Sequence, residues 1–243
     1  DFLPPGHFVN QRLATWLPGG HDQALTAEHL HWRLYALLQD PKHLQSPAFS
    51  EVKRYLNGND PALLAWQMAG ELALIYEKYQ AWRRHWLLAW HEKPDPDDWQ
   101  SLLWHQASQG RPFRAQAVEA YIHAYQHPDC PRPAGLPDRL FVFACQNLSP
   151  DVLHILQSFG RWCRVDFFLH NPCQEFWGDI SNGHTPVAAD CLYENPFLNR
   201  WGFAGRDFVS ALLLDQSSTW AGEQENYIPA DTRPDACLLH RIQ

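Results

Sequence analysis

The sequence predicts an α/β protein that is rich in helix, with a helical first part and a smaller α/β second part. Through the first half, apolar side chains recur every three or four positions, as they do on one face of a helix. The segment HPDCPRPAGLPD (127–138) then interrupts the pattern with four prolines and a glycine, which predicts a boundary. After it come two short apolar runs separated by a helical pattern, and this order indicates a β-α-β unit.

The first helical segments are bounded by residues that favour helix ends. The segment PGHFVNQRLATWL is followed by Pro18-Gly19-Gly20, which stops a helix. Thr26 is predicted to cap the segment AEHLHWRLYALL, which carries Glu28 in its first turn. A short helix is expected through FSEVKRYL, before the turn NGND.

A long helix is expected after Asp60-Pro61, where Asp60 is the N-cap and proline takes the first helical position. The pattern extends to Trp90, about 30 residues, which exceeds the mean helix length, so a break within it is consistent with the pattern. The expected core stripe consists of Leu64, Met68, Leu72, Ile75, Tyr79, Trp82, Trp86 and Trp90.

The rest of the helical part contains a loop and two shorter helices. The loop EKPDPDD (92–98) is rich in proline and acid, and the helices are expected at WQSLLWHQAS and FRAQAVEAYIHAYQ.

The β-α-β unit is the best-supported structural prediction. RLFVFAC (139–145) and RVDFFLH (164–170) are continuous apolar runs, typical of strands buried on both faces of a parallel sheet. The helix between them is expected to have Ser149 as N-cap, Pro150 at its first position and Gly160 as its stop. Beyond it, residues 181–196 look irregular and 198–216 look like a loop that enters a helix.

Composition limits the function classes. The formal net charge is −8, so nucleic-acid contact requires a local cationic patch rather than a generally basic surface. No apolar run is long enough to cross a membrane, and no export signal is visible at the start. The six cysteines form no C-x-x-C pair, which favours a reducing, cytoplasmic compartment.

The stretch HNPCQEFWGDI (170–180) raises the question of a catalytic or metal site, because it follows a predicted strand. Its pair His170-x-x-Cys173, together with His127-x-x-Cys130, has the ligand types of a four-ligand zinc site. The simpler interpretation is that proline shapes both loops without a metal.

Other catalytic signatures are weak. The sequence lacks G-x-x-x-x-G-K-[ST], G-x-G-x-x-G and G-x-S-x-G, so it predicts no nucleotide cofactor and no serine nucleophile of that type. A Cys–His pair and a hydrolase built on Asp166, Glu175 and Asp179 remain minor alternatives.

Arginines interleaved with aromatic residues point to single-stranded DNA. Trp82-Arg83-Arg84-His85-Trp86 places two guanidiniums between two indoles, and Arg111-x-x-Arg114 opens the following helix. Such a set supplies charge for phosphates and rings for bases. The alternative is that Trp82 and Trp86 belong to the core stripe and that the arginines are its solvated edge.

Specific strings in the chain resemble one family. These are DFLPPGHFV, HWRLYALL, YEKYQAWRRHWLLAW, LPDRLFVFACQNLSPDVLHILQSFG, FFLHNPCQEFWGDI and NPFLNRWGFAGRDFVSALLLD. They resemble RecC, the gamma chain of exodeoxyribonuclease V, over essentially the whole chain.

The resemblance implies a helicase-like fold of superfamily 1 without ATPase motifs. Residues 1–130 would be a helical domain inserted into a RecA-like α/β domain, of which 136–243 would be the returning part. It further implies a non-catalytic subunit without metal or cofactor that scaffolds a RecBCD complex with a RecB-like beta chain and a RecD-like alpha chain. Such a subunit guides the unwound 3′-ended strand and contributes to recognition of the hotspot Chi during repair by recombination. HNPCQEFWGDI would then be a packing loop.

The resemblance also selects DNA-contact residues. Arg83 and Arg114 match family arginines, and Glu77 and Ile75 on the same helix as Arg83 are candidates for the tunnel wall; Arg84 and Arg111 are their neighbours in sequence. The chain departs from the family at three positions. Asn10 stands where Trp is expected, Glu77 stands where Asp is expected, and Leu74 stands where another acidic residue is expected. The segment of residues 181–196 is also shorter than the corresponding segment in the family.

A different class of function stays open beside DNA guidance. In that hypothesis the helices form a pure protein-interaction module that docks the beta chain and never touches DNA. A zinc-dependent hydrolase around the two H-x-x-C pairs is the remaining alternative.

Overall fold

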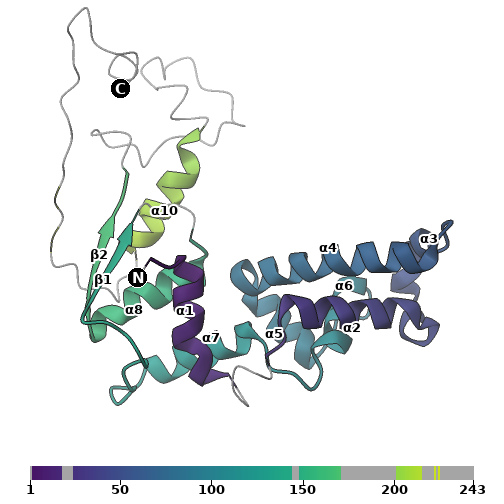
Figure 1. Cartoon of the computed structure of the whole chain (residues 1–243), viewed down its shortest axis with the longest axis horizontal. Helices are drawn as coiled ribbons and strands as arrows, with labels where there is room; N and C mark the ends of the chain where they lie inside the picture. The colour runs from purple at the N-terminus through teal and green to yellow at the C-terminus, as the bar shows by residue number, and fades with distance from the viewer. Residues whose placement is uncertain are drawn as a thin grey trace, which may run out of the picture. The chain divides into compact units, whose positions relative to one another are not determined.

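The computed structural model describes residues 2–17, 24–143, 148–170 and 201–214, together with 222 and 224. These residues are mostly helical, with two strands (Figure 1). The chain divides into two compact units, one of residues 1–136 with 149–152 and one of residues 137–148 with 153–243.

The first unit is built from helices, as the apolar pattern predicts. In chain order they are α1 (Pro5–Leu13), α2 (Ala27–Gln39), α3 (Ser50–Leu56), α4 (Pro61–Trp82), α5 (Arg84–Glu92), α6 (Trp99–Ser108) and α7 (Arg114–Tyr125). Short 3₁₀ helices extend α1 at Ala14–Trp16 and lead into α3 at Pro41–Leu44 and Pro47–Phe49. Figure 1 shows α2 and α4 running side by side.

The N-caps predicted for α2 and α4 are confirmed. The Thr26 hydroxyl accepts the backbone N–H of His29 at 3.2 Å, and the Asp60 carboxylate accepts that of Leu63 at 3.1 Å. Each bond satisfies an amide that has no partner inside its helix. Pro61 takes the first helical position of α4, where no backbone donor is required.

The long helix expected from residue 61 to 90 breaks at Arg83, which separates α4 from α5. Arg83 has φ −137° and ψ 36°, outside the helical region. Its backbone N–H donates to Tyr79 O at 2.7 Å, and its carbonyl oxygen accepts the Trp86 N–H at 2.9 Å. The backbone groups at the break are therefore bonded, although neither glycine nor proline marks the position in the sequence.

The expected core stripe of this helix pair is wrong at two of its three tryptophans, whereas Trp90 packs against the core. Trp82 and Trp86 are 44% and 40% exposed. The buried face of α4 is rotated toward smaller residues, which allow α2 to pack closely. It consists of Ala65, Ala69, Leu72, Ala73, Tyr76 and Gln80.

The core of the first unit closes around α6. Trp104 is fully buried, and its indole N–H donates to Leu87 O at 2.9 Å. Its ring lies 5.1 Å from both Tyr76 and Phe113, so one large side chain joins α4, α5 and the start of α7.

The second unit contains both strands and most of the connecting helix of the predicted β-α-β unit. β1 (Arg139–Phe143) pairs in parallel with β2 (Arg164–Phe168), in register from Arg139↔Arg164 to Phe143↔Phe168. α8 (Pro150–Ser158) connects the strands, with a 3₁₀ turn at Phe159–Arg161 around the predicted stop Gly160. α10 (Phe203–Leu214) follows.

Two details of this unit correct the sequence prediction. The first concerns the cap of α8: the Ser149 hydroxyl is buried and makes no hydrogen bond to any described residue, so the expected N-cap is not formed.

The second correction is that the strands are not buried on both faces. Phe167 packs against Leu153 of α8 and Phe208 of α10, but its neighbour Phe168 points to the opposite face and is exposed. Phe143, in register with Phe168, is 73% exposed. Within the described residues, helices cover one face of the sheet.

Among the described helices, none is both long and apolar enough to cross a membrane.

Candidate nucleic-acid interface

The break between α4 and α5 carries an exposed arginine surrounded by aromatic rings. The Arg83 guanidinium lies 5.4 Å from the centre of the Trp86 ring, and one of its N–H groups donates to Trp82 O at 3.2 Å. Trp86 in turn lies 5.7 Å from Tyr79 and 5.9 Å from Trp90. We call this set, Tyr79, Trp82, Arg83, Trp86 and Trp90, the Arg83 aromatic cluster.

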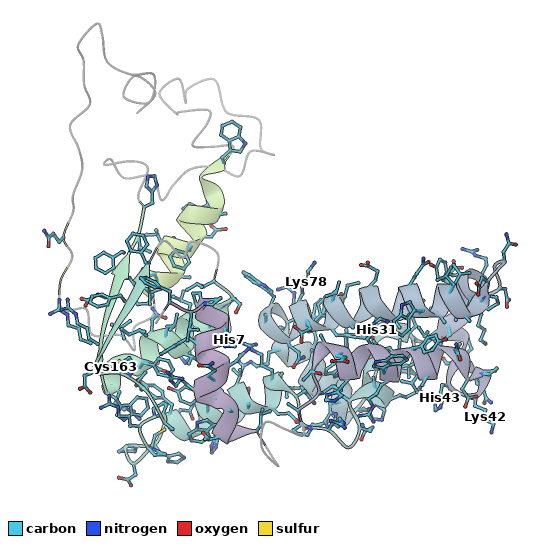
Figure 2. All side chains as sticks on the ribbon, in the orientation of Figure 1. His7, His31, Lys42, His43, Lys78 and Cys163 are labelled. Carbon is cyan, nitrogen blue, oxygen red and sulfur yellow. The ribbon has the colours of Figure 1, made fainter. Side chains whose placement is uncertain are left out.

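The chemistry of this cluster suits a single strand of nucleic acid. An exposed guanidinium bonds phosphate oxygens, and exposed indole faces stack on bases of any sequence. The break leaves Arg83 outside both helices, with its guanidinium near the ring of the exposed Trp86. Figure 2 shows Lys78, another basic side chain, on α4 before this point.

Arg114 has a different environment from Arg83. Its Nε donates to Asn10 Oδ1 at 2.8 Å, and its Nη1 donates to Gln80 O at 2.8 Å. Burial lowers the pKa of Arg114 from its usual value; the nearby carboxylates of Asp151 and Glu77 oppose the shift, and Arg84 adds to it. Arg114 therefore ties α1 and α7 to the end of α4.

A small pocket of about 140 Å³ opens beside Arg114. Its polar wall is formed by Asn10, Glu77, Gln80 and Arg114, and its apolar wall by Leu13, Leu17, Ala24, Leu25 and Ala117. The Gln80 side chain is buried, and its Oε1 makes no hydrogen bond to any described residue. Gln80 therefore places a buried, unpaired acceptor at the pocket wall, and its backbone carbonyl accepts from Arg114.

The structure brings some of the predicted site residues together and separates others. Glu77 and Arg114 share the pocket. Arg84 is held in ion pairs, with Glu119 at 2.6 Å and with Asp151 at 3.4 Å, so its charge is already compensated. Ile75 packs against the core.

Arg111 belongs to another neighbourhood. Burial lowers the pKa of Arg33, and the charge of the nearby Arg111 lowers it further. Arg33 itself donates to Gln109 O at 2.8 Å, at the turn between α6 and α7.

Sequence reasoning missed the role of Gln80 and treated Asn10 only as a departure from a pattern. Gln80 follows Tyr76 by one helical turn on the buried face of α4, and an amide at a core position is the signal that points to a polar pocket. Asn10 carries no such signal, because its contact with Arg114 joins residues 104 positions apart.

In the part of the chain that the structure describes, no arrangement of residues supports the zinc site, the Cys–His pair or the carboxylate hydrolase. No group of three or more His, Cys, Asp or Glu there could hold a metal ion. Cys130 is buried and Asp166 lies in β2. Cys173, Glu175 and Asp179, and the predicted packing loop to which they belong, lie outside the described residues.

These features define a helix-rich protein with a small parallel sheet and an exposed arginine next to a cluster of tryptophan and tyrosine rings. The chain belongs to the family described as RecC, N-terminal domain, whose sequence model matches residues 1–243.

Two curated relatives carry the same name. The chain is 27% identical over 289 residues to "RecBCD enzyme subunit RecC" of Escherichia coli, an alignment that covers 100% of this chain and 25% of the relative. It is 25% identical over 284 residues to the protein of that name from Haemophilus influenzae, covering 88% of this chain and 25% of the relative. The chain therefore spans about a quarter of the length of these relatives.

Proposed function

We propose that this chain is the part of a RecC subunit that guides a single DNA strand through a RecBCD-type helicase and nuclease complex. Membership of the RecC N-terminal family supports the assignment to such a complex. The proposed partners are a RecB-like beta chain and a RecD-like alpha chain, acting in the cytoplasm during repair by recombination. The described residues supply guidance and scaffolding in this proposal, and the chemistry belongs to the partners.

The observation that carries the DNA contact is the Arg83 aromatic cluster. Trp82 and Trp86 are exposed although they continue an apolar stripe, and Arg83 lies between them in the sequence with its guanidinium near one indole face. Leaving large rings in water forgoes the stability that burial would supply, so a function at the surface is the simplest reason for the arrangement.

The pocket beside Arg114 is proposed as the place where bases are distinguished. The exposed Glu77 carboxylate and the exposed Asn10 amide, which Arg114 holds at the pocket wall, can bond the edge of an unstacked base. Because Asn10 and Glu77 differ from the residues expected in the family, the hotspot sequence recognised here is proposed to differ as well.

The β-α-β unit is proposed as the returning part of a RecA-like domain, residues 136–243, with the helical domain of residues 1–130 inserted before it. The parallel pairing of β1 and β2 across α8 is consistent with that fold.

Fluorescence anisotropy of a labelled single-stranded oligonucleotide tests the DNA contact. Arg83→Ala should weaken binding by about tenfold, since it removes one charged contact and one side of a stacking surface. Arg54→Ala is the matched control, because Arg54 is an exposed arginine on α3 of the same unit. An equal loss in both variants, or no binding by the unmodified protein at low salt, would instead favour the pure interaction module.

A further inference from the structure

A second and larger recess lies between α2 and α4. Its volume is about 470 Å³, and it is bordered by Ala27, Glu28 and His31 of α2 and by Trp66, Gln67, Gly70, Glu71, Ala73 and Leu74 of α4. Figure 2 places His31 between the two helices, where its Nε2 lies 3.1 Å from Trp66 O. We call this recess the α2–α4 groove. It shares no lining residue with the pocket beside Arg114.

Small residues and a stack of rings create the groove. A Cβ at Gly70 would lie 3.4 Å from His31 Cε1, so a larger side chain there would enter the recess. The His31 ring packs 4.0 Å from Trp66, which also touches Trp32 at 4.9 Å and Tyr35 at 5.3 Å. One wall is therefore a preformed aromatic surface.

Exposed apolar side chains line the groove or lie next to it. Leu74 lines it and is 55% exposed. Trp32, whose ring is 4.9 Å from that of Trp66, and Leu63, on α4, are 55% and 50% exposed. Leu63, Gly70 and Leu74 follow one another at helical spacing, so they form one stripe along α4. Exposed large apolar side chains gathered around a recess are typical of protein-binding surfaces.

The charges at the groove select the partner. Glu28 and Glu71 line it, one from each helix, both are exposed, and none of the lining residues is Lys or Arg. Lys78 lies one turn beyond Leu74, so the acidic section is the one between Glu28 and Glu71. Two carboxylates beside an apolar floor repel phosphates and attract cationic side chains.

We propose that the α2–α4 groove is a docking site for an amphipathic helix of a partner protein, with apolar residues on one face and arginine or lysine beside them. The apolar face would enter between Trp66 and Leu74, as helices do in grooves of this kind, and the basic residues would pair with Glu28 and Glu71. This surface is separate from the DNA contact proposed above and does not depend on it.

The test uses two short fluorescent helical peptides with the same leucine face, one flanked by arginine and the other by glutamate. The arginine peptide should bind the chain, and Glu71→Lys should weaken that binding by about tenfold and strengthen binding of the glutamate peptide. Glu92→Lys is the matched control, because Glu92 is an exposed carboxylate at the end of α5 that does not line the groove.

A second variant separates shape from charge. Gly70→Leu fills the groove and leaves both carboxylates in place, so it should also weaken the arginine peptide by about tenfold, with circular dichroism confirming that the helices persist. Arg83→Ala should leave peptide binding unchanged, which separates this proposal from the DNA contact.

Three outcomes would overturn the docking site. They are equal binding of the two peptides, an equal effect of Glu92→Lys and Glu71→Lys, and a Gly70→Leu protein that binds the arginine peptide as before. Direct binding of a single-stranded oligonucleotide that Gly70→Leu weakens and Arg83→Ala does not would make the groove a nucleic-acid surface instead.

Discussion

Two arginines that look alike in the sequence have different roles at the scale of single residues. Arg83 and Arg114 both stand beside aromatic residues in strings typical of DNA contact. The Arg83 side chain is exposed, and among the hydrogen bonds described its guanidinium donates only to the carbonyl of Trp82. Arg114 is bonded to Asn10 and Gln80 and joins three helices. Arg83 is thus the residue whose removal tests binding without disturbing the fold.

Replacing Arg114 should mainly affect stability. Arg114→Ala would leave the Gln80 carbonyl and the Asn10 amide oxygen without their donor, and should lower the free energy of unfolding by about 1–3 kcal/mol. Urea denaturation followed by circular dichroism measures this change. Arg83→Ala, compared in the same way, should stay within about 0.5 kcal/mol of the unmodified protein. Equal losses would show that the two residues do not differ as described.

His91 should make the helical unit less stable in mild acid. Burial first, and the charge of His105 second, lower its pKa below the usual value of 6.5, with Glu92 opposing. As the pH falls through 6.5, the unfolded chain therefore binds a proton at His91 that the folded chain does not yet bind. The free energy of unfolding therefore decreases as the pH falls. Urea denaturation at pH 7.5 and 5.5 should show a smaller loss for His91→Gln than for the unmodified protein; an unchanged loss would exclude His91 as the cause.

At the scale of elements, local rules account for the ends of the helices. The Asp60 carboxylate accepts an amide of the first turn of α4, at 3.1 Å from Leu63 N. Asp60→Ala should therefore lower the free energy of unfolding by about 1 kcal/mol, measured in urea, whereas Asp60→Asn should be nearly neutral because its amide oxygen can accept the same bond. A full loss with Asn would mean that the carboxylate acts through its charge.

Some of these elements could be predicted from the sequence and others could not. Caps, prolines and periodicity predicted α2, α4, α6 and α7 and the parallel pairing of β1 with β2, because these depend on neighbours in the chain. A break in the long helix was consistent with its length, but its position at Arg83 was not predicted, because neither glycine nor proline marks it in the sequence. The exposed face of the sheet was missed because continuous apolar runs do not reveal which face a helix covers.

The candidate site was predictable in part for the same reason. The Arg83 aromatic cluster lies within residues 79–90, and its residue types predicted a contact with nucleic acid. The pocket beside Arg114 joins α1, α4 and α7 and required the structure, as did the α2–α4 groove.

At the scale of the whole molecule, a net charge of −8 requires that any DNA contact be local. The salt dependence of binding should therefore be shallow, because few phosphates are neutralised, and Arg83→Ala should reduce the slope of log K against log salt by about 0.7, the contribution of one phosphate on a single strand. Anisotropy titrations at several salt concentrations measure the slope. An unchanged slope would mean that Arg83 does not contact a phosphate.

The most direct test of the central claim is photocrosslinking of a single-stranded oligonucleotide that carries 5-iodouracil, followed by mass spectrometry of the tryptic peptides. If the strand stacks on the Arg83 aromatic cluster, adducts should form on Trp82 or Trp86 and should decrease in Arg83→Ala. Adducts confined to other aromatic residues, such as Trp32 and Trp66 of the α2–α4 groove, would contradict the proposed path of the strand.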